Sequence, residues 1–119
     1  MAERELKECV ETLRIALAAQ PDTPANVIAR EAVRIADLLI RKNQDYGCSA
    51  WTEPLMAPGI DPRTALQVRM SDKVMRIFSL SKKDATAKVN ESIEDTMRDL
   101  AGYAILWLSC PQSGVEKSF

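Results

Sequence analysis

The chain has 119 residues, 46% of them hydrophobic, and its 16 lysines and arginines against 17 aspartates and glutamates leave a formal charge of −1. This near balance gives no overall basic field, so duplex nucleic acid and acidic membranes are not expected partners. The chain has no histidine, which excludes Ser-His-Asp and Cys-His catalysis and leaves a carboxylate or a metal-bound hydroxide as the general base.

Length and segment composition predict one cytoplasmic domain over residues 1–119. The charged N-terminus lacks an apolar signal segment, and no apolar run approaches the roughly 20 residues that span a bilayer. Three cysteines, Cys9, Cys48 and Cys110, are odd in number and widely separated. We interpret them as reduced thiols, because a zinc site needs closer spacing and usually histidine.

The first half of the chain predicts two amphipathic helices. From residue 3 to about residue 19, apolar side chains recur at the three-and-four spacing of a helix, and Gln20-Pro21 ends the run. A second helix is predicted from about residue 25 to residue 44. Residues 45–62 then form a long irregular loop, since they carry Pro54, Pro58, Gly59 and Pro62. Its large apolar side chains, such as Trp51, indicate a binding loop or lid.

A third helix is predicted to start after Asp61-Pro62, with Asp61 as its cap, and to continue to about Ser81. A stripe beside its apolar face places three cations on one side of the helix, together with Asp72. The ordinary explanation is a solvated face with Asp72 as an internal partner. The cations of this stripe are Arg69, Lys73 and Arg76.

The fourth helix is predicted to begin at Asp84 or Thr86 and to run to about Cys110, before Pro111. Beyond residue 99 it is apolar on all sides, which is typical of a central helix or a subunit interface. We therefore expect an all-α, four-helix bundle-like domain that forms a homodimer or higher homo-oligomer through this C-terminal helix. Residues 112–119 are expected to be a frayed tail.

An acidic stripe follows the first half of this helix. Glu91, Asp95 and Asp99 recur every four residues, with Glu94 beside them. Like charges at that spacing repel by a few tenths of a kcal/mol per pair, so a cation is expected against them. Mg²⁺ or Mn²⁺ suits carboxylate oxygens and keeps phosphate oxygens as further ligands. The alternative is an acidic N-terminal turn favoured by the helix dipole, with Arg98 as a local partner.

The two stripes together suit a metal-bound polyphosphate. Carboxylates would hold the ion, and the cations of the third helix would bind phosphate oxygens through charge-assisted hydrogen bonds. Lys42, Asp45 and Tyr46 lie at another helix end, and Tyr46 or Trp51 is a candidate to stack on a base. For either aromatic alone, core packing or loop anchoring is the ordinary role.

Three motifs in this order resemble the nucleotide-modification-associated domain family of phage and bacterial genomes. They are Arg41-Lys-Asn-Gln-Asp45-Tyr-Gly47, then Arg69-x-x-Asp72-Lys73-x-x-Arg76, then Glu91-Ser-Ile-Glu-Asp95-Thr-x-x-Asp99-Leu-Ala-Gly-Tyr103-Ala. The resemblance covers roughly residues 30–108 and implies a bacterial or phage-infected cytosol. That family is in turn similar to the MazG-like and dimeric dUTPase-like all-α pyrophosphohydrolases. This wider similarity implies a helical bundle, Mg²⁺ and hydrolysis between the α and β phosphates.

The chain departs from the pyrophosphohydrolase pattern in its acidic pairs. Those enzymes carry a Glu-x-x-Glu pair on one helix and a Glu-x-x-Asp pair on the next acidic helix. Here Glu91 and Asp95 are four residues apart, and the second helix has no acidic pair separated by three residues. Either Asp45 substitutes from a helix end, or the site has fewer metal ligands than a hydrolase needs.

The leading hypothesis is a Mg²⁺-dependent (or Mn²⁺-dependent) nucleoside triphosphate pyrophosphohydrolase-like protein that acts on canonical or modified nucleotides. Metal would bind to Glu91, Asp95 and Asp99, while Glu94 or Asp45 would complete the shell or orient water. The substrate-binding residues would be Lys42, Tyr46, Trp51, Arg69, Lys73 and Arg76. One alternative is a protein that sequesters a nucleotide or cyclic nucleotide signal without hydrolysis. Another is a purely structural helical dimer with solvated charges.

Overall fold

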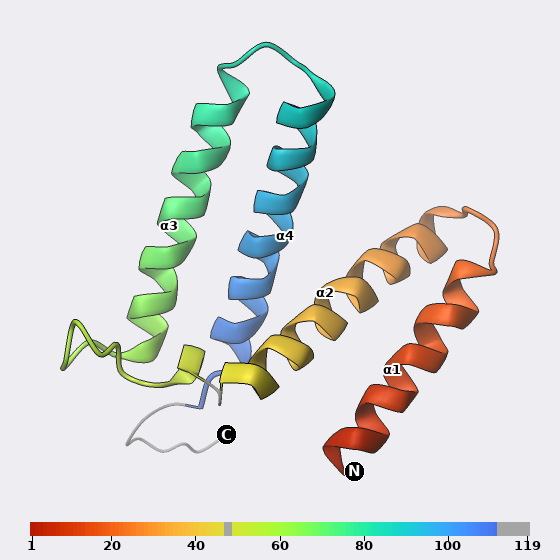
Figure 1. Ribbon diagram of the computed structural model, residues 1–119, viewed down its shortest axis with the longest axis horizontal. Helices are drawn as coiled ribbons and strands as arrows, with labels where there is room; N and C mark the ends of the chain where they lie inside the picture. Colours follow the sequence, from red (N-terminus) through yellow and green to blue (C-terminus); the bar gives the residue numbers. More distant parts are fainter. Residues whose placement is uncertain (47–48, 112–119) are drawn as a thin grey trace. The chain divides into compact units, whose positions relative to one another are not determined.

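The computed structural model describes the backbone of residues 1–46 and 49–111 and the side chains of residues 1–42 and 49–111. Four α-helices and one short 3-10 helix make up the regular structure of these residues, which contain no strand (Figure 1). They are α1 (Glu3–Ala18), α2 (Pro24–Tyr46), η1 (Ser49–Trp51), α3 (Pro62–Ser81) and α4 (Ala87–Ser109). The predicted all-α class is therefore confirmed, and each predicted helix boundary lies close to the observed one.

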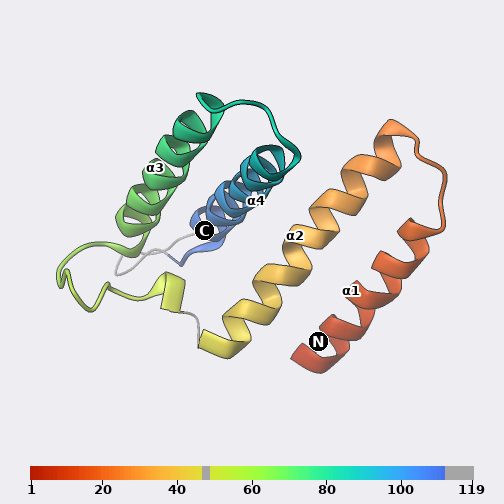
Figure 2. The same cartoon turned by 45° about the horizontal axis from the view of Figure 1, so that its top comes forward.

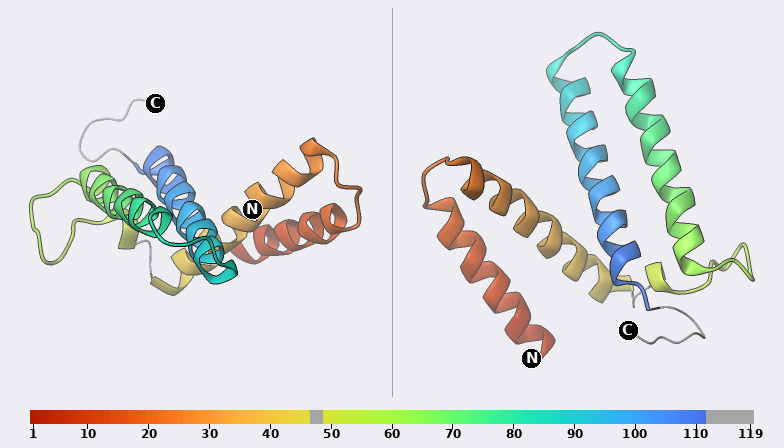
Figure 3. Two further views of the ribbon diagram at one scale, coloured as in Figure 1. Left: turned by 90° about the horizontal axis from the view of Figure 1, so that it is seen from above. Right: turned by 180° about the vertical axis from the view of Figure 1, so that it is seen from behind.

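The chain divides into two compact units, Met1–Gly47 and Cys48–Phe119, and each contains one pair of helices. In both units the two helices lie side by side and run in opposite directions, as Figure 2 and the two views of Figure 3 show. Association of the two hairpins as one bundle-like domain stays a prediction. None of the described helices is long and apolar enough to cross a bilayer.

The turn of the α1–α2 hairpin is fastened by Arg30 of α2. Its Nε donates to the Leu17 carbonyl at 2.9 Å, and a terminal nitrogen pairs with Asp22 Oδ1 at 2.5 Å. The same guanidinium donates to the Gln20 carbonyl. The Leu17 carbonyl lies in the last turn of α1, at the negative end of the helix dipole, and Gln20 and Asp22 lie in the turn that follows. This contact holds the end of α1 against α2.

Both helices of the second hairpin begin at a side-chain cap. The Asp61 carboxylate accepts hydrogen bonds from the backbone N–H groups of Arg63 and Thr64, and the Thr86 hydroxyl accepts one from Val89. The predicted cap at Asp61 is confirmed, and of the two candidate starts for α4 the structure has Thr86.

The core of this hairpin is small. Leu66 is fully buried, Leu80 and Cys110 are nearly so, and Gly102 is a buried position of α4. Thr96 is buried with its hydroxyl donating to the Ser92 carbonyl at 2.7 Å, so its polar atom is satisfied within the helix. The packed α3–α4 pair places the acidic and the cationic stripes on neighbouring helices.

Candidate functional site

An ion pair joins the two predicted stripes in the middle of the α3–α4 hairpin. Lys73 Nζ of α3 lies 3.5 Å from Asp99 Oδ2 of α4. The lysine side chain is 28% exposed and the aspartate side chain 41%. The cationic and acidic stripes therefore meet at this level of the hairpin, on a surface that a solvent-borne ligand reaches.

The next level of the hairpin carries a second pair of opposite charges. Because α3 and α4 are antiparallel, Arg76 and Asp95 each lie about one turn nearer the α3–α4 turn than the Lys73–Asp99 pair. Asp95 bonds instead to Arg98 of its own helix, whose Nη1 is 3.3 Å from Asp95 Oδ1. Arg98, which the sequence indicates as the local partner of the acidic stripe, thus pairs with Asp95.

Two guanidinium groups of the cationic stripe remain available. Arg69 and Arg76 are both exposed, and neither forms a hydrogen bond or ion pair with the residues whose side chains the structure describes. They flank Lys73 by about one turn on either side, on the same stripe of α3. Three cations thus line one stripe of the helix, and only Lys73 among them is paired with a carboxylate.

The carboxylates of α4 are less concentrated than a metal cage requires. Glu91 and Glu94 are exposed. Within residues 1–42 and 49–111, no three His, Cys, Asp or Glu side chains come together closely enough to hold a metal ion. Mg²⁺, however, is commonly held by one or two carboxylates with substrate phosphates and water completing its octahedron. Asp95 and Asp99, one turn apart on α4, fit that second kind of site.

Three predicted site residues belong to the other compact unit. Lys42 is exposed on α2. The side chains of Asp45 and Tyr46 lie outside the described residues, so their predicted roles in completing the metal shell and in stacking stay predictions.

Trp51, the remaining predicted substrate-binding residue, anchors its loop. Its indole Nε1 donates to the Leu106 carbonyl at 3.0 Å, and its side chain is partly buried. This contact holds η1 against the last turns of α4. It also uses the one hydrogen-bond donor of the tryptophan side chain, the indole N–H. A role in ligand binding would therefore use only the ring face.

Sequence reasoning missed a cluster at the base of the same hairpin. The guanidinium carbon of Arg63 lies 4.3 Å from the centre of the Trp107 ring, and its terminal nitrogen donates to the Cys110 carbonyl at 3.4 Å. The Trp107 Nε1 donates to Gln67 Oε1 at 3.3 Å. A cation stacked on an aromatic face contributes about 0.5–1 kcal/mol at an exposed site and more where water is excluded. Partners this far apart in sequence leave no local signal.

Arg63 also has an unsatisfied donor, since its buried Nε has no hydrogen-bond partner among the residues that the structure describes. The pKa of the nearby Cys110 thiol is raised, mainly by burial. Arg63 lowers this pKa and Asp61 raises it, each to a smaller extent. Both the burial and the raised pKa disfavour the reactive thiolate form of Cys110. Cys9 and Cys110 are both free, as the predicted reduced state requires, and Cys48 lies outside the described residues.

The structure thus defines an all-α protein in which one lysine of the cationic stripe on α3 pairs with one aspartate of α4. The model of the family called nucleotide modification associated domain 1 matches residues 42–109, which is more than half of the chain. The chain belongs to this family, and the match contains every residue of the predicted site. Comparisons with curated proteins and with solved structures found no match. The wider similarity to MazG-like pyrophosphohydrolases stays a prediction.

Proposed function

We propose that the chain binds a nucleoside triphosphate, canonical or modified, on the α3–α4 hairpin, and hydrolyses it with Mg²⁺ in the manner of a pyrophosphohydrolase. The observation that supports this proposal is the Lys73–Asp99 contact, flanked on α3 by two arginines without partners. A row of cations beside a row of carboxylates suits a ligand that is itself both anionic and metal-bound. Membership of a family associated with nucleotide modification supports the same class of ligand.

The roles follow from the chemistry of each side chain. Arg69, Lys73 and Arg76 bind phosphate oxygens, with the two arginines suited to bidentate contacts. Asp95 and Asp99 would hold Mg²⁺, and the ion when bound would supply charge neutralisation at the phosphates and an acidified water. Coordination by Glu91 stays a prediction. Glu94 orients the attacking water, and the ring face of Trp51 contacts the nucleoside. The roles predicted for Lys42, Asp45 and Tyr46 stay predictions.

Substitution of Asp95 by asparagine tests the enzymatic proposal. We expect Asp95→Asn to abolish Mg²⁺-dependent pyrophosphate release, because the amide removes the negative charge that the metal requires. Its helical circular-dichroism spectrum should be unchanged, since within the described residues Asp95 is 63% exposed and bonds only to Arg98 of its own helix. Asp84→Asn, in the exposed turn before α4, is the matched control and should retain wild-type activity. Retained turnover in Asp95→Asn would remove Asp95 from the site.

Binding without hydrolysis is the second candidate, and the sparse carboxylates favour it. The described side chains offer a pair of metal ligands on α4 rather than a group of three. Such a site would retain a nucleotide or cyclic nucleotide with its phosphates intact. Calorimetry that shows stoichiometric binding, with the nucleotide recovered unchanged after long incubation with Mg²⁺, would establish this function in place of the enzyme.

A homodimer or higher oligomer belongs to the same proposal. The apolar second half of α4 is only partly covered, with Ile105 40% and Leu108 72% exposed. We infer that a second copy of the chain packs on this end of α4. That copy would also supply further carboxylates, of which one chain has too few for a metal cage. Symmetric pairing of one patch with itself is the commonest form of such assembly.

A further inference from the structure

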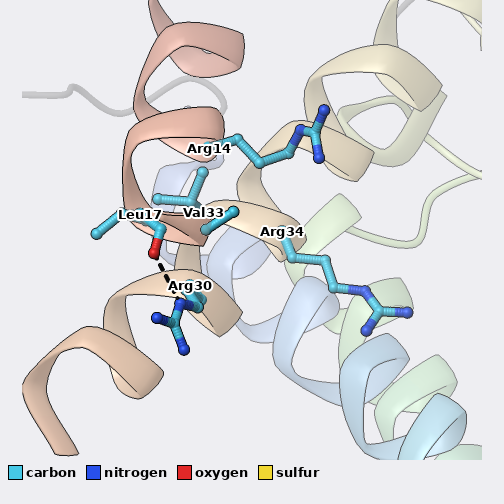
Figure 4. Close-up of a pocket in the computed structure, with 6 residues that line it drawn as sticks. Arg14, Leu17, Arg30, Val33 and Arg34 are labelled. Carbon is cyan, nitrogen blue, oxygen red and sulfur yellow. Dashed lines mark hydrogen bonds between the residues drawn. The ribbon is translucent and has the colours of Figure 1, made fainter. Parts of the chain in front are cut away.

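The α1–α2 hairpin contains a pocket of about 300 Å³ that has no part in the proposed nucleotide site (Figure 4). Pockets for small ligands begin at about this volume and combine apolar walls with a few polar groups. The residues that line this pocket precede the segment matched by the family model. They are the apolar Leu17, Ala18 and Val33 and the arginines Arg14, Arg30 and Arg34.

The three arginines differ in how their charge is balanced. Arg30 is fully engaged by Asp22 and by the carbonyls at the end of α1. Arg14 pairs with Glu11 through two hydrogen bonds, at 3.0 and 2.6 Å. Arg34 forms no hydrogen bond or ion pair with any side chain or backbone group in the described part of the chain. The pocket therefore carries one guanidinium without a counter-charge.

The three arginines also differ in the direction of their side chains. In Figure 4 the Arg30 guanidinium turns back toward the Leu17 carbonyl, whereas Arg14 and Arg34 extend away from it. Leu17 and Val33, one from each helix, are half-buried between them. The pocket thus joins an apolar surface to two guanidinium groups, one of them unpaired.

We propose that this pocket binds a small organic oxyanion, a carboxylate or phosphoryl group attached to an apolar body about the size of one ring. The planar fork of Arg34 pairs with two oxygens of the anion, and Arg14 adds a second positive group while it keeps Glu11. The apolar body packs on Leu17, Ala18 and Val33. The residues that line this pocket are different from those of the proposed nucleotide site.

Titration of the full chain, followed by amide chemical shifts, tests this proposal. The probes are benzoate, phenyl phosphate, inorganic phosphate and the neutral benzyl alcohol, each at millimolar concentrations. We expect benzoate or phenyl phosphate to shift amides of residues 14–18 and 30–34 in a saturable manner. Which of the two binds more tightly identifies the source of the oxyanion. Inorganic phosphate should bind more weakly because it lacks the apolar body, and benzyl alcohol because it lacks the charge.

Two variants and one control make the assignment specific. Arg34→Gln should weaken binding of the better probe about tenfold, the loss expected for one charge-assisted hydrogen-bonded pair. Ala18→Leu adds bulk at an apolar residue that lines the pocket, without changing the charge, and should also weaken binding. Arg4→Gln removes an exposed arginine of α1 whose partner is Glu8 and should leave binding unchanged. Absence of saturable shifts in these residues, or equal affinity of wild type and Arg34→Gln, would overturn the proposal.

Discussion

At the scale of single residues, the contact between Lys73 and Asp99 connects the stability of the hairpin to the proposed site. The pair is partly exposed, and ion pairs of that kind contribute about 0.2–1 kcal/mol after the cost of ordering both side chains. A contact of this strength does not determine the fold. The proposed function gives this pair a second role, in ligand binding.

A double-mutant cycle separates these two roles. Lys73→Met and Asp99→Asn, alone and together, should show a coupling of about 0.2–1 kcal/mol in the free energy of unfolding measured with urea. Each single variant should nonetheless weaken nucleotide binding about tenfold or more, because each removes a charge that faces the phosphates or the metal. A large coupling in stability with unchanged nucleotide affinity would assign the pair to structure alone.

The exposed Glu11–Arg14 pair gives a prediction for pH. The hydrogen bonds from Arg14 lower the pKa of the Glu11 carboxyl, and the same contact raises the pKa of Arg14. Since the pKa of Glu11 is lower in the folded chain than in the unfolded one, the pair's contribution is present at neutral pH. It is lost as the pH falls through the lowered pKa. We expect Arg14→Gln to return the pKa of Glu11 toward its ordinary range in a carboxyl-detected NMR titration.

The matched control for that titration is Arg4→Gln. Arg4 pairs with Glu8 one turn away on the same exposed side of α1, at 3.5 Å, and has no contact with Glu11. The pKa of Glu11 should therefore be the same in Arg4→Gln as in the wild type. If Arg14→Gln also leaves it unchanged, the hydrogen bonds between Glu11 and Arg14 do not persist in solution.

At the scale of helices, the sequence predicts the elements well wherever local chemistry marks their ends. The Asp61-Pro62 pair gives α3 a cap and a first residue that needs no backbone donor, and Thr86 caps α4. The contacts that hold each hairpin together are not local. Arg30 reaches carbonyls up to 13 residues away, and Arg63 stacks on a ring 44 positions along the chain. Neither contact can be deduced from spacing within one helix.

In the candidate site, too, local features can be predicted from the sequence and contacts between helices cannot. Helical periodicity alone places the acidic residues on one stripe of α4 and the cations on one stripe of α3. The register between the two helices decides which charges meet, and helical periodicity does not reveal that register. Lys73 therefore reaches Asp99, whereas Asp95 bonds within its own helix. For Trp51 the sequence leaves two roles open, stacking on a base or anchoring the loop, and the structure shows that its indole anchors the loop.

Truncation of Leu66 tests the small core of the α3–α4 hairpin. This side chain is fully buried, so Leu66→Ala should lower the free energy of unfolding by about 2–5 kcal/mol through lost burial and a residual cavity. Leu55→Ala, at a side chain that is 93% exposed, should change it by less than about 0.5 kcal/mol. Urea denaturation followed by circular dichroism measures both. Similar values for the two variants would show that Leu66 is not buried in solution.

At the scale of the whole molecule, the exposed apolar end of α4 predicts self-association. Leu108→Lys should shift the sedimentation coefficient toward that of a monomer, because a charge in an apolar interface loses its hydration without gaining a partner. Met56→Lys makes the same substitution at a side chain that is 94% exposed, in the loop before α3, and should sediment like the wild type. A wild-type chain that sediments as a monomer at all concentrations would contradict the proposed oligomer.

Nucleotide binding at the cationic stripe of α3 is the central claim, and one calorimetric comparison tests it most directly. Wild-type chain and the double variant Arg69→Gln/Arg76→Gln are each titrated with a panel of nucleoside triphosphates in the presence of Mg²⁺. These two exposed arginines form no hydrogen bond or ion pair within the described structure, so the variant should fold like the wild type. The account predicts saturable binding of at least one triphosphate to the wild type and about a hundredfold weaker binding to the variant. No binding by the wild type, or equal affinity in both proteins, would contradict it.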